Sequence, residues 1–348
     1  MVELWFGIVA VMLTMYVVMD GFDLGAGVLH LWVARNNEER RQVLAAIGPY
    51  WDANEVWLLA TGGALFVAFP KVLASGLSGF YFAIFLVLWC LILRGISIEF
   101  RSHVASPLWR TFWDVAFTVG SILLCIFFGC ALGNLLRGLP MDANGWFTLS
   151  LFTDFSARPP VGILDWYTVL VGVYALVALV MQGGTYLAWK TDGAVMERSR
   201  ALASRAAWLV AMLWPVMTIL TIRMHGPMFA QFAHRPLAWA CVLLALGGLV
   251  SVMVGLRRGT SLRAFLGSCA FLAGLMAATA ASIFPAMLRD IGGAGPSLTA
   301  FTASNDAYGL KTALGWWLLG IPLVVAYFAI QFRVHAGKAT APREGEGY

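Results

Sequence analysis

Long apolar stretches separated by short polar connections dominate this sequence of 348 residues. A helix needs about 20 mainly apolar residues to cross the hydrocarbon core of a bilayer. Alternation typical of strands is absent, and a helix satisfies its own backbone polar groups in lipid. We therefore predict an all-α integral membrane protein with nine transmembrane helices, over residues 4–33, 44–69, 78–98, 111–135, 163–189, 205–222, 237–255, 265–287 and 313–334.

The connections between these spans predict two halves. The longest polar connection, 136–162, contains three prolines and is interpreted as an outer loop. Met19-Asp20-Gly21 recurs as Met181-Gln182-Gly183, and Pro49 is echoed by Pro215, although chance repetition explains such a faint signal as well. The predicted domains are a four-helix bundle over 1–135, the loop 136–162, a second four-helix bundle over 163–287, a loop with a peripheral ninth helix over 288–334, and a polar, disordered cytoplasmic tail over 335–348.

The lysines and arginines predict the orientation of the chain in the membrane. If the N-terminus lies outside, 16 of the 23 basic residues fall in inner segments and 7 in outer ones. Cytoplasmic loops carry an excess of Lys and Arg, so this distribution favours an outside N-terminus and a cytoplasmic C-terminus. The net charge of +5 follows from these loops, and we do not interpret it as a nucleic-acid surface.

Composition excludes a soluble domain. Hydrophobic residues make up 60% of the chain and charged residues 12%, whereas soluble domains are about 25% charged. The five cysteines all lie in apolar segments without metal-ligand spacing, so we interpret them as small buried hydrophobic residues. The N-terminus begins MVELWFG, with an acid and no basic segment, which predicts that the first helix is retained rather than cleaved.

Four acidic residues stand out against this apolar background: Asp20, Asp23, Asp52 and Glu55. Each carboxylate at membrane depth costs about 2.5–3.5 kcal/mol on insertion scales, so a use for them is expected. At 100° per residue, Asp20, Asp23 and His30 share one helical stripe, and Asp52 and Glu55 share another. We interpret Asp20 and Asp52 as a proton path from the cytoplasm, and Asp23 and Glu55 as structural pairs. The alternative for all four is bonding to backbone amides or to an arginine of a partner.

Other polar residues have simpler interpretations. Arg94 and Glu99 lie at the inner end of the third span, where snorkelling and pairing at the interface explain them. Asn134 ends the fourth span, and a helix-terminal hydrogen bond is its expected role. Of the five histidines only His30 falls inside a span, without an intramembrane histidine partner. Because a membrane haem needs axial ligands on facing helices, we predict that this chain alone binds no haem and no metal.

At this point a family resemblance becomes apparent. Four segments of the first 81 residues closely resemble subunit II of the cytochrome bd-type quinol oxidases, including their cyanide-insensitive branch. These segments are DGFDLGAG, RNNEERR, PYWDANEVWLLATGGALFVAFP and GFY. Later segments agree, namely RGISIEFR, GNLLRG, GGTYLAWKTDG at 183–193 and SND at 304–306. The resemblance covers almost the whole chain, although the loop 136–162 is less typical. Tyr50 stands where some relatives carry histidine.

The resemblance implies a multi-pass protein of the bacterial inner membrane that pairs with a homologous subunit I. In this family subunit I carries two b-type haems, the d-type haem and the quinol site. The complex oxidises quinol and reduces O₂ to water, taking protons from the cytoplasm. Acids matching Asp20 and Asp52 lie on the proton route of the family, and Trp51 belongs to the same motif as a supporting residue. A structural quinone occurs in subunit II of some members, and small accessory subunits are a further possible partner.

Two other functions fit the same residues. A stand-alone proton-coupled transporter would also carry acids inside the membrane and consist of two halves. A purely structural partner subunit would use these acids to bind a neighbouring chain. Cytochrome bd oxidase subunit II, without a redox centre of its own, is the function that the sequence favours.

Overall fold

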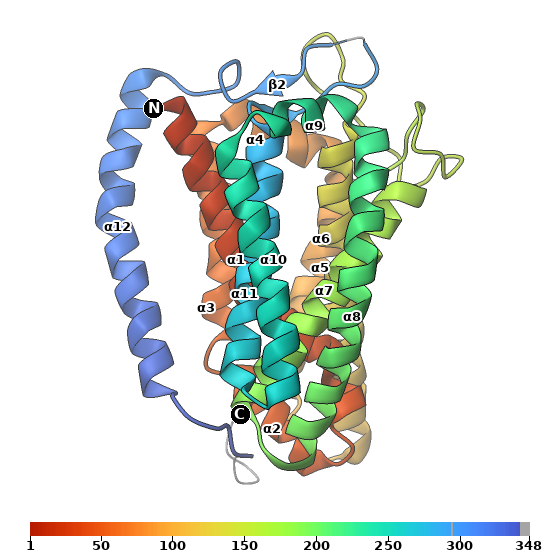
Figure 1. Cartoon of the computed structure of the whole chain (residues 1–348), viewed down its shortest axis with the longest axis vertical. Helices are drawn as coiled ribbons and strands as arrows, with labels where there is room; N and C mark the ends of the chain where they lie inside the picture. Colours follow the sequence, from red (N-terminus) through yellow and green to blue (C-terminus); the bar gives the residue numbers. More distant parts are fainter. Residues whose placement is uncertain (294, 342–348) are drawn as a thin grey trace.

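Twelve helices and two short strands form the computed structural model, which describes residues 1–293 and 295–341 (Figure 1). The strands, Ala286–Leu288 and Leu298–Thr299, pair antiparallel. The helices are α1 (Val2–Val33), α2 (Asn37–Ile47), α3 (Trp51–Ala68), α4 (Pro70–Gly79), α5 (Tyr81–Phe100), α6 (Pro107–Arg137), α7 (Trp166–Lys190), α8 (Gly193–Met224), α9 (Gly226–Ala233), α10 (Pro236–Arg258), α11 (Ser261–Ile283) and α12 (Ala307–Val334). We call the end of the molecule that holds α2 the α2 end, and the opposite end, with α4 and α9, the loop end.

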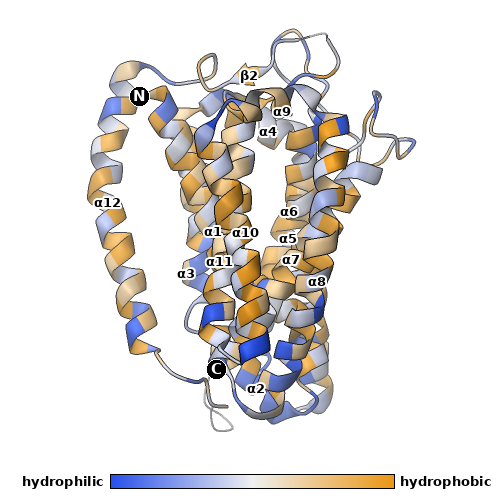
Figure 2. Cartoon of the chain, viewed as in Figure 1, coloured by the Kyte–Doolittle hydropathy of each residue, from blue (hydrophilic) through white to orange (hydrophobic). Residues whose placement is uncertain are grey.

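Within the described residues, eight helices are long and apolar enough to cross a membrane. They are α1, α5, α6, α7, α8, α10, α11 and α12, and they confirm eight of the nine predicted spans with shifted boundaries. The largest shifts are at α8, which begins at Gly193, and at α11, which ends at Ile283 before a strand. Figure 2 shows that these helices are mainly hydrophobic along their length.

The second predicted span, 44–69, is not one continuous helix, and this prediction is wrong. Helix α2 ends at Ile47, a turn contains Pro49, and α3 begins at Trp51. Proline lacks a backbone N–H and its ring clashes with the preceding helical turn, so the chain breaks here rather than bends. Helix α3 has only 18 residues, and its first two turns contain polar side chains, which explains why it differs from the other eight.

Helices α1 and α7 cross at the centre of the molecule through two glycines. A Cβ atom on Gly25 would lie 1.9 Å from the carbonyl oxygen of Leu179, and one on Gly183 would lie 2.2 Å from the carbonyl carbon of Gly25. Only glycine therefore permits this approach, because the neighbouring atoms belong to a helix backbone.

Around this crossing the helix contacts occur in a repeated pattern. Helix α1 contacts α3 and α6, whereas α7 contacts α8 and α11. Helix α5 pairs with α6 as α10 pairs with α11. The pattern resembles two similar four-helix groups, which contact each other through α6 and α7 as well as through α1 and α7.

Helix α12 lies at the edge of the molecule (Figure 1), and none of the residues in its most apolar window is buried. At the loop end the Trp5 indole N–H donates to the carbonyl of Leu310 (3.0 Å). At the α2 end the carbonyl of His335 accepts from Tyr50 (3.2 Å) and from Lys190 (2.6 Å). The helix is thus fixed by hydrogen bonds at both ends, and along its length Phe328 stacks on Trp57 of α3, with ring centroids 5.8 Å apart.

The start of the C-terminal tail is bound rather than disordered. The Lys338 ammonium donates to the carbonyls of Trp189 (2.6 Å) and Thr191 (2.8 Å), and the Ala339 N–H donates to Lys190 (2.6 Å). The prediction of a disordered tail is therefore wrong for residues 335–341, because this segment satisfies carbonyls at the end of α7. Residues 342–348, which the prediction also covered, lie outside the described residues.

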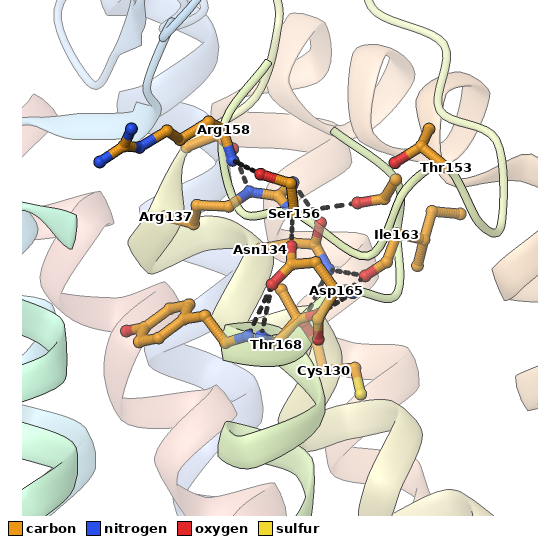
Figure 3. A network of polar contacts seen from close by, with 12 residues as sticks. Cys130, Asn134, Arg137, Thr153, Ser156, Arg158, Ile163, Asp165 and Thr168 are labelled. Carbon is orange, nitrogen blue, oxygen red and sulfur yellow. Dashed lines mark hydrogen bonds and ion pairs between the residues drawn. The ribbon is translucent and has the colours of Figure 1, made fainter. Parts of the chain in front are cut away.

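A buried polar network anchors the predicted outer loop (Figure 3). Arg137, at the end of α6, forms an ion pair with Asp165 and donates to the carbonyl of Gly162 (3.0 Å). Asp165 also caps α7, accepting from the backbone N–H groups of Tyr167 and Thr168. The Asn134 amide donates to the carbonyl of Ile163 (2.9 Å), which confirms its predicted helix-terminal hydrogen bond. The ends of α6 and α7 are thereby held together.

The α1–α7 crossing generates a stability prediction. We expect Gly183→Leu to destabilise the protein by about 3 kcal/mol, because the new side chain meets backbone that cannot move aside. Gly7→Leu, also in a helix but with nothing within 4 Å of the added Cβ, serves as the matched control. Thermal unfolding of the purified protein in detergent, followed by circular dichroism, measures the difference. Equal unfolding temperatures for the two variants would contradict the proposed role of the crossing.

Candidate functional site

Three helices bring five polar residues together inside the membrane-spanning part of the protein. We call Asp20, Asp23, Asn54, Glu55 and Arg94 the Arg94 cluster. One guanidinium nitrogen of Arg94, Nη2, donates both to Asp20 Oδ1 and to Glu55 Oε1, each at 2.7 Å. The Asn54 amide donates to Asp23 Oδ2 at 2.7 Å and to the Met19 carbonyl at 3.2 Å. The cluster thus joins α1, α3 and α5.

Burial within the cluster is uneven. The side chains of Asp20 and Arg94 are fully buried, whereas that of Glu55 is 24% exposed. Arg94 therefore does not reach an interface, and the prediction that it snorkels is wrong. The physical reason is that Asp20 and Glu55 supply opposite charge inside the protein, so the guanidinium gains its partners without leaving the core. The cluster opens to the surface of the chain at Glu55.

Several polar atoms of the cluster are buried without a hydrogen-bond partner among the described residues. They are Nε and Nη1 of Arg94, Oδ2 of Asp20, Oδ1 of Asp23 and Oδ1 of Asn54. Buried polar groups in proteins are nearly always hydrogen-bonded, to ordered water where no protein group is available. The cluster therefore offers a set of donors and acceptors suited to bound water.

The charges of the cluster are also unequal. Three carboxyl groups share the cluster with a single guanidinium, and one positive charge can balance one negative charge. A membrane environment strongly disfavours the remaining negative charges unless protons or further cations neutralise them. Chemically, this is an arrangement that can bind and release protons while no unpaired charge stays buried.

The other predicted site residues lie outside the cluster. Asp52 is exposed in the first turn of α3, one turn before Glu55 on the same helix. The ring of Trp51 packs against α5, where a Cβ on Gly95 would lie 3.3 Å from it. Glu99 is exposed near the end of α5, and its carbonyl accepts from His103 (2.8 Å). Of the predicted residues, the structure brings together Asp20, Asp23, Glu55 and Arg94.

Sequence reasoning missed Asn54, which lies within the motif WDANEVW, and a second buried cluster around Asp114. Asp114 Oδ1 is 2.6 Å from His30 Nε2 and 2.5 Å from Arg101 Nε, and its Oδ2 accepts from Arg40 at 2.9 Å. An acid inside the predicted span 111–135 was the available signal, but His30 lies 84 residues earlier in the chain. The ring of His30 is thus engaged with a carboxylate.

Among the described residues, no group of three or more His, Cys, Asp or Glu side chains could hold a metal ion.

A further ion pair links the halves at the α2 end. Glu39, in α2, accepts from Arg198 of α8 at 2.7 Å and from the backbone N–H of Arg35 at 2.6 Å. The hydrogen bond from Arg198 lowers the pKa of Glu39 below its ordinary value. The short connection between α1 and α3 is therefore fixed to the second half of the chain.

Comparison with known proteins identifies a matching family and several relatives of this chain. The family model described as cytochrome bd terminal oxidase subunit II matches residues 1–335. The chain is 30% identical to the cytochrome bd-I ubiquinol oxidase subunit 2 of Escherichia coli K12, over 94% of this chain and 92% of that protein. It is 29% identical to the cytochrome bd ubiquinol oxidase subunit 2 of Bacillus subtilis, over 95% of this chain and 96% of that protein.

A solved structure shares the fold. A chain of the bd oxidase from Geobacillus thermodenitrificans superposes with a TM-score of 0.75 and 18% sequence identity, covering 96% of this chain and 98% of that chain. The match of the family model over nearly the whole sequence, together with relatives of the same length, leads to one conclusion: this chain belongs to the cytochrome bd terminal oxidase subunit II family.

Proposed function

We propose that this chain is the haem-free subunit of a cytochrome bd-type quinol oxidase and carries protons towards a haem-bearing subunit I. The observation that supports this proposal best is the Arg94 cluster, in which buried carboxyl groups share one guanidinium and open to the surface at Glu55. The relatives are subunits of ubiquinol oxidases, in which reduction of O₂ to water consumes protons. The function of this chain is to deliver them.

The proposed path begins at Asp52, at the α2 end of α3. From there a proton passes to Glu55, one turn further along the helix, and then to Asp20, whose carboxylate shares the donor Arg94 Nη2 with Glu55. Water bound to the unpaired polar atoms of the cluster completes the connections. Glu55 was interpreted from the sequence as a structural pair, but its contact with Arg94 favours its inclusion in the path. Asp23, bonded to Asn54, keeps the structural role.

Subunit I is proposed to cover the face formed by α3 and α5. Leu59 of α3 and Trp89 of α5 are 74% and 73% exposed, and Glu55, one turn before Leu59, is partly exposed. Lipid against a carboxyl group would be costly, whereas a protein partner can supply polar groups and continue the proton path. With α2 and the C-terminal segment in the cytoplasm, as the basic residues predict, the path starts on the cytoplasmic side of the bacterial inner membrane.

The haems and the quinol site are assigned to subunit I. His30, the only histidine inside a predicted span, is not free to serve as an axial haem ligand, because its ring is engaged with Asp114. For a structural quinone the best candidate is an apolar groove of about 480 Å³ between α1, α3 and α12. Aromatic side chains line this groove at Trp5, Tyr308, Trp316 and Trp317.

A stand-alone transporter is not favoured, because the relatives are oxidase subunits.

The proton path is tested by Asp52→Asn. Because a positioned proton-transfer group contributes about 10²–10⁴-fold, we expect O₂ consumption by the purified complex to fall about tenfold or more. The complex should assemble with an unchanged haem spectrum. Glu38→Gln, at an exposed acid of α2, is the matched control and should retain full activity.

The result also separates the proton path from the structural alternative. Normal turnover of the Asp52→Asn complex would remove Asp52 from the path. Failure of that variant to assemble with subunit I would favour a purely structural role for this acid.

The role of Arg94 is tested separately. Arg94→Gln leaves two buried acids without their counter charge, and we expect the complex to lose about 3–5 kcal/mol of stability. Arg94→Lys keeps the positive charge, so the complex with this variant should lose less stability than the complex with Arg94→Gln. The temperature at which the haem absorption of the purified complex disappears reports the effect. If Arg94→Gln were as stable as the unmodified complex, the ion pairs would not organise the cluster.

The proposed interface is tested by Trp89→Ala. A large aromatic residue at the centre of an interface contributes about 2 kcal/mol or more, so the variant should release subunit I at lower detergent concentration. Leu237→Ala truncates a 70% exposed side chain on α10 and serves as the control. The measurement is the amount of haem-bearing subunit retained on the tagged chain across a detergent series. Equal retention for both variants would exclude Trp89 from the interface.

A further inference from the structure

The α2 end of α8, α10 and α11 carries an unbalanced basic surface. No Asp or Glu occurs between Glu197 and Asp290 in the sequence. Within this stretch Arg257 and Arg258 end α10, and Arg263 lies in the first turn of α11. All three side chains are exposed.

Several other arginines at this end of the molecule have acidic partners in the protein. Arg40 and Arg101 bind Asp114, and Arg198 binds Glu39. The stretch that contains Arg257, Arg258 and Arg263 has no acid of its own. A ligand from outside the chain can therefore balance their charge.

An apolar groove leads away from this basic surface along α10 and α11. Its volume is about 570 Å³, and the residues that line it include Leu243, Leu244, Gly247, Leu262, Arg263 and Leu266. Arg263 lies at its end nearest the helix termini, and Ala270 also lines it, seven residues further along α11. At 1.5 Å per residue the groove extends about 10–12 Å into the span.

The glycines of α10 divide into two groups. Gly248 packs against α11, where an added Cβ would lie 2.4 Å from the backbone nitrogen of Phe271. A Cβ on Gly247 would meet no atom within 4 Å, so this glycine faces the open groove. A larger residue at position 247 would thus fill the groove without disturbing the contact between the helices.

An aromatic side chain indicates the depth of the arginines in the membrane. The Arg257 guanidinium lies 5.6 Å from the centre of the Trp208 ring on α8. Tryptophan is enriched at the level of the lipid headgroups. Figure 2 shows hydrophilic residues at this end of α10 and a mainly hydrophobic helix beyond them. The basic surface is thus at the headgroup level, and the groove points into the hydrocarbon.

We propose that the groove between α10 and α11 binds an anionic phospholipid of the membrane. Its phosphate binds Arg258 and Arg263, and one acyl chain lies in the groove over Gly247. Basic pockets between transmembrane helices bind anionic headgroups in this way, and each arginine near the surface contributes about fivefold in affinity. The lipid occupies the face of the second half, away from the proposed proton path.

The test uses the purified two-subunit complex and native mass spectrometry. Delipidated complex is titrated with phosphatidylglycerol or with phosphatidylcholine, and the first bound lipid is quantified. We expect the R258Q/R263Q variant to bind phosphatidylglycerol about 25-fold more weakly, and phosphatidylcholine to bind weakly throughout. R158Q/R223Q removes two exposed arginines at the loop end and is the matched charge control, expected to leave binding unchanged.

A second pair of variants tests the groove itself. Gly247→Leu should reduce phosphatidylglycerol binding strongly, whereas Gly247→Ala should reduce it little. If Gly247→Leu bound phosphatidylglycerol like the unmodified complex, the lipid would not occupy the groove. Equal weakening in the two arginine double variants, or equal affinity for both lipids, would also overturn the proposal. Should R258Q/R263Q fail to assemble, the comparison of the two Gly247 variants decides by itself.

Discussion

A positive charge inside the hydrocarbon layer is the constraint around which the first half of this protein is built. The guanidinium of Arg94 is fully buried, and it is stable there because Asp20 and Glu55 approach it from two other helices. The three helices must therefore keep one relative position. The same interaction leaves more carboxyl groups than cations, which gives a buried site capable of exchanging protons. One arginine thus holds the three helices together, and the proton transfer that we propose for this chain depends on the same residue.

The position of Asp20 depends in turn on the crossing of α1 and α7. Because Gly25 and Gly183 have no side chains, the two helix backbones approach more closely than any other residue would allow. This crossing fixes α1 between helices of both halves. Asp20, about one and a half turns from Gly25, is held towards α5, where Arg94 is placed to meet it. Gly25 and Gly183 therefore help to fix the position of Asp20 without contacting the Arg94 cluster.

The two halves differ in the charged residues that they contain, although their helices make similar contacts. In the first half, buried acids pair with arginines, around Arg94 in the middle and around Asp114 at the α2 end. In the second half, no acid occurs between Glu197, near the start of α8, and Asp290, and Gln182 stands at the position that repeats Asp20. Its amide donates to the carbonyl of Val18 (3.1 Å), so a neutral contact replaces the ion pair. The proton path and the basic lipid surface are accordingly proposed for different halves.

The sequence by itself determined the membrane class, most of the spans and the family. Long apolar runs must lie in lipid, and motifs such as DGFDLGAG and PYWDANEVW are specific enough to identify relatives. It also identified Asp20, Asp23 and Glu55 as unusual, because acids inside apolar helices are energetically costly.

Only the tertiary structure decided which acid meets which base. The contact of Arg94 with Asp20 joins residues 74 positions apart, and that of His30 with Asp114 joins residues 84 apart. No helical period relates such positions, since they depend on how separate helices pack. The binding of the tail through Lys338 has the same origin. Each of these contacts joins residues that are distant in the sequence and become adjacent only when the helices assemble.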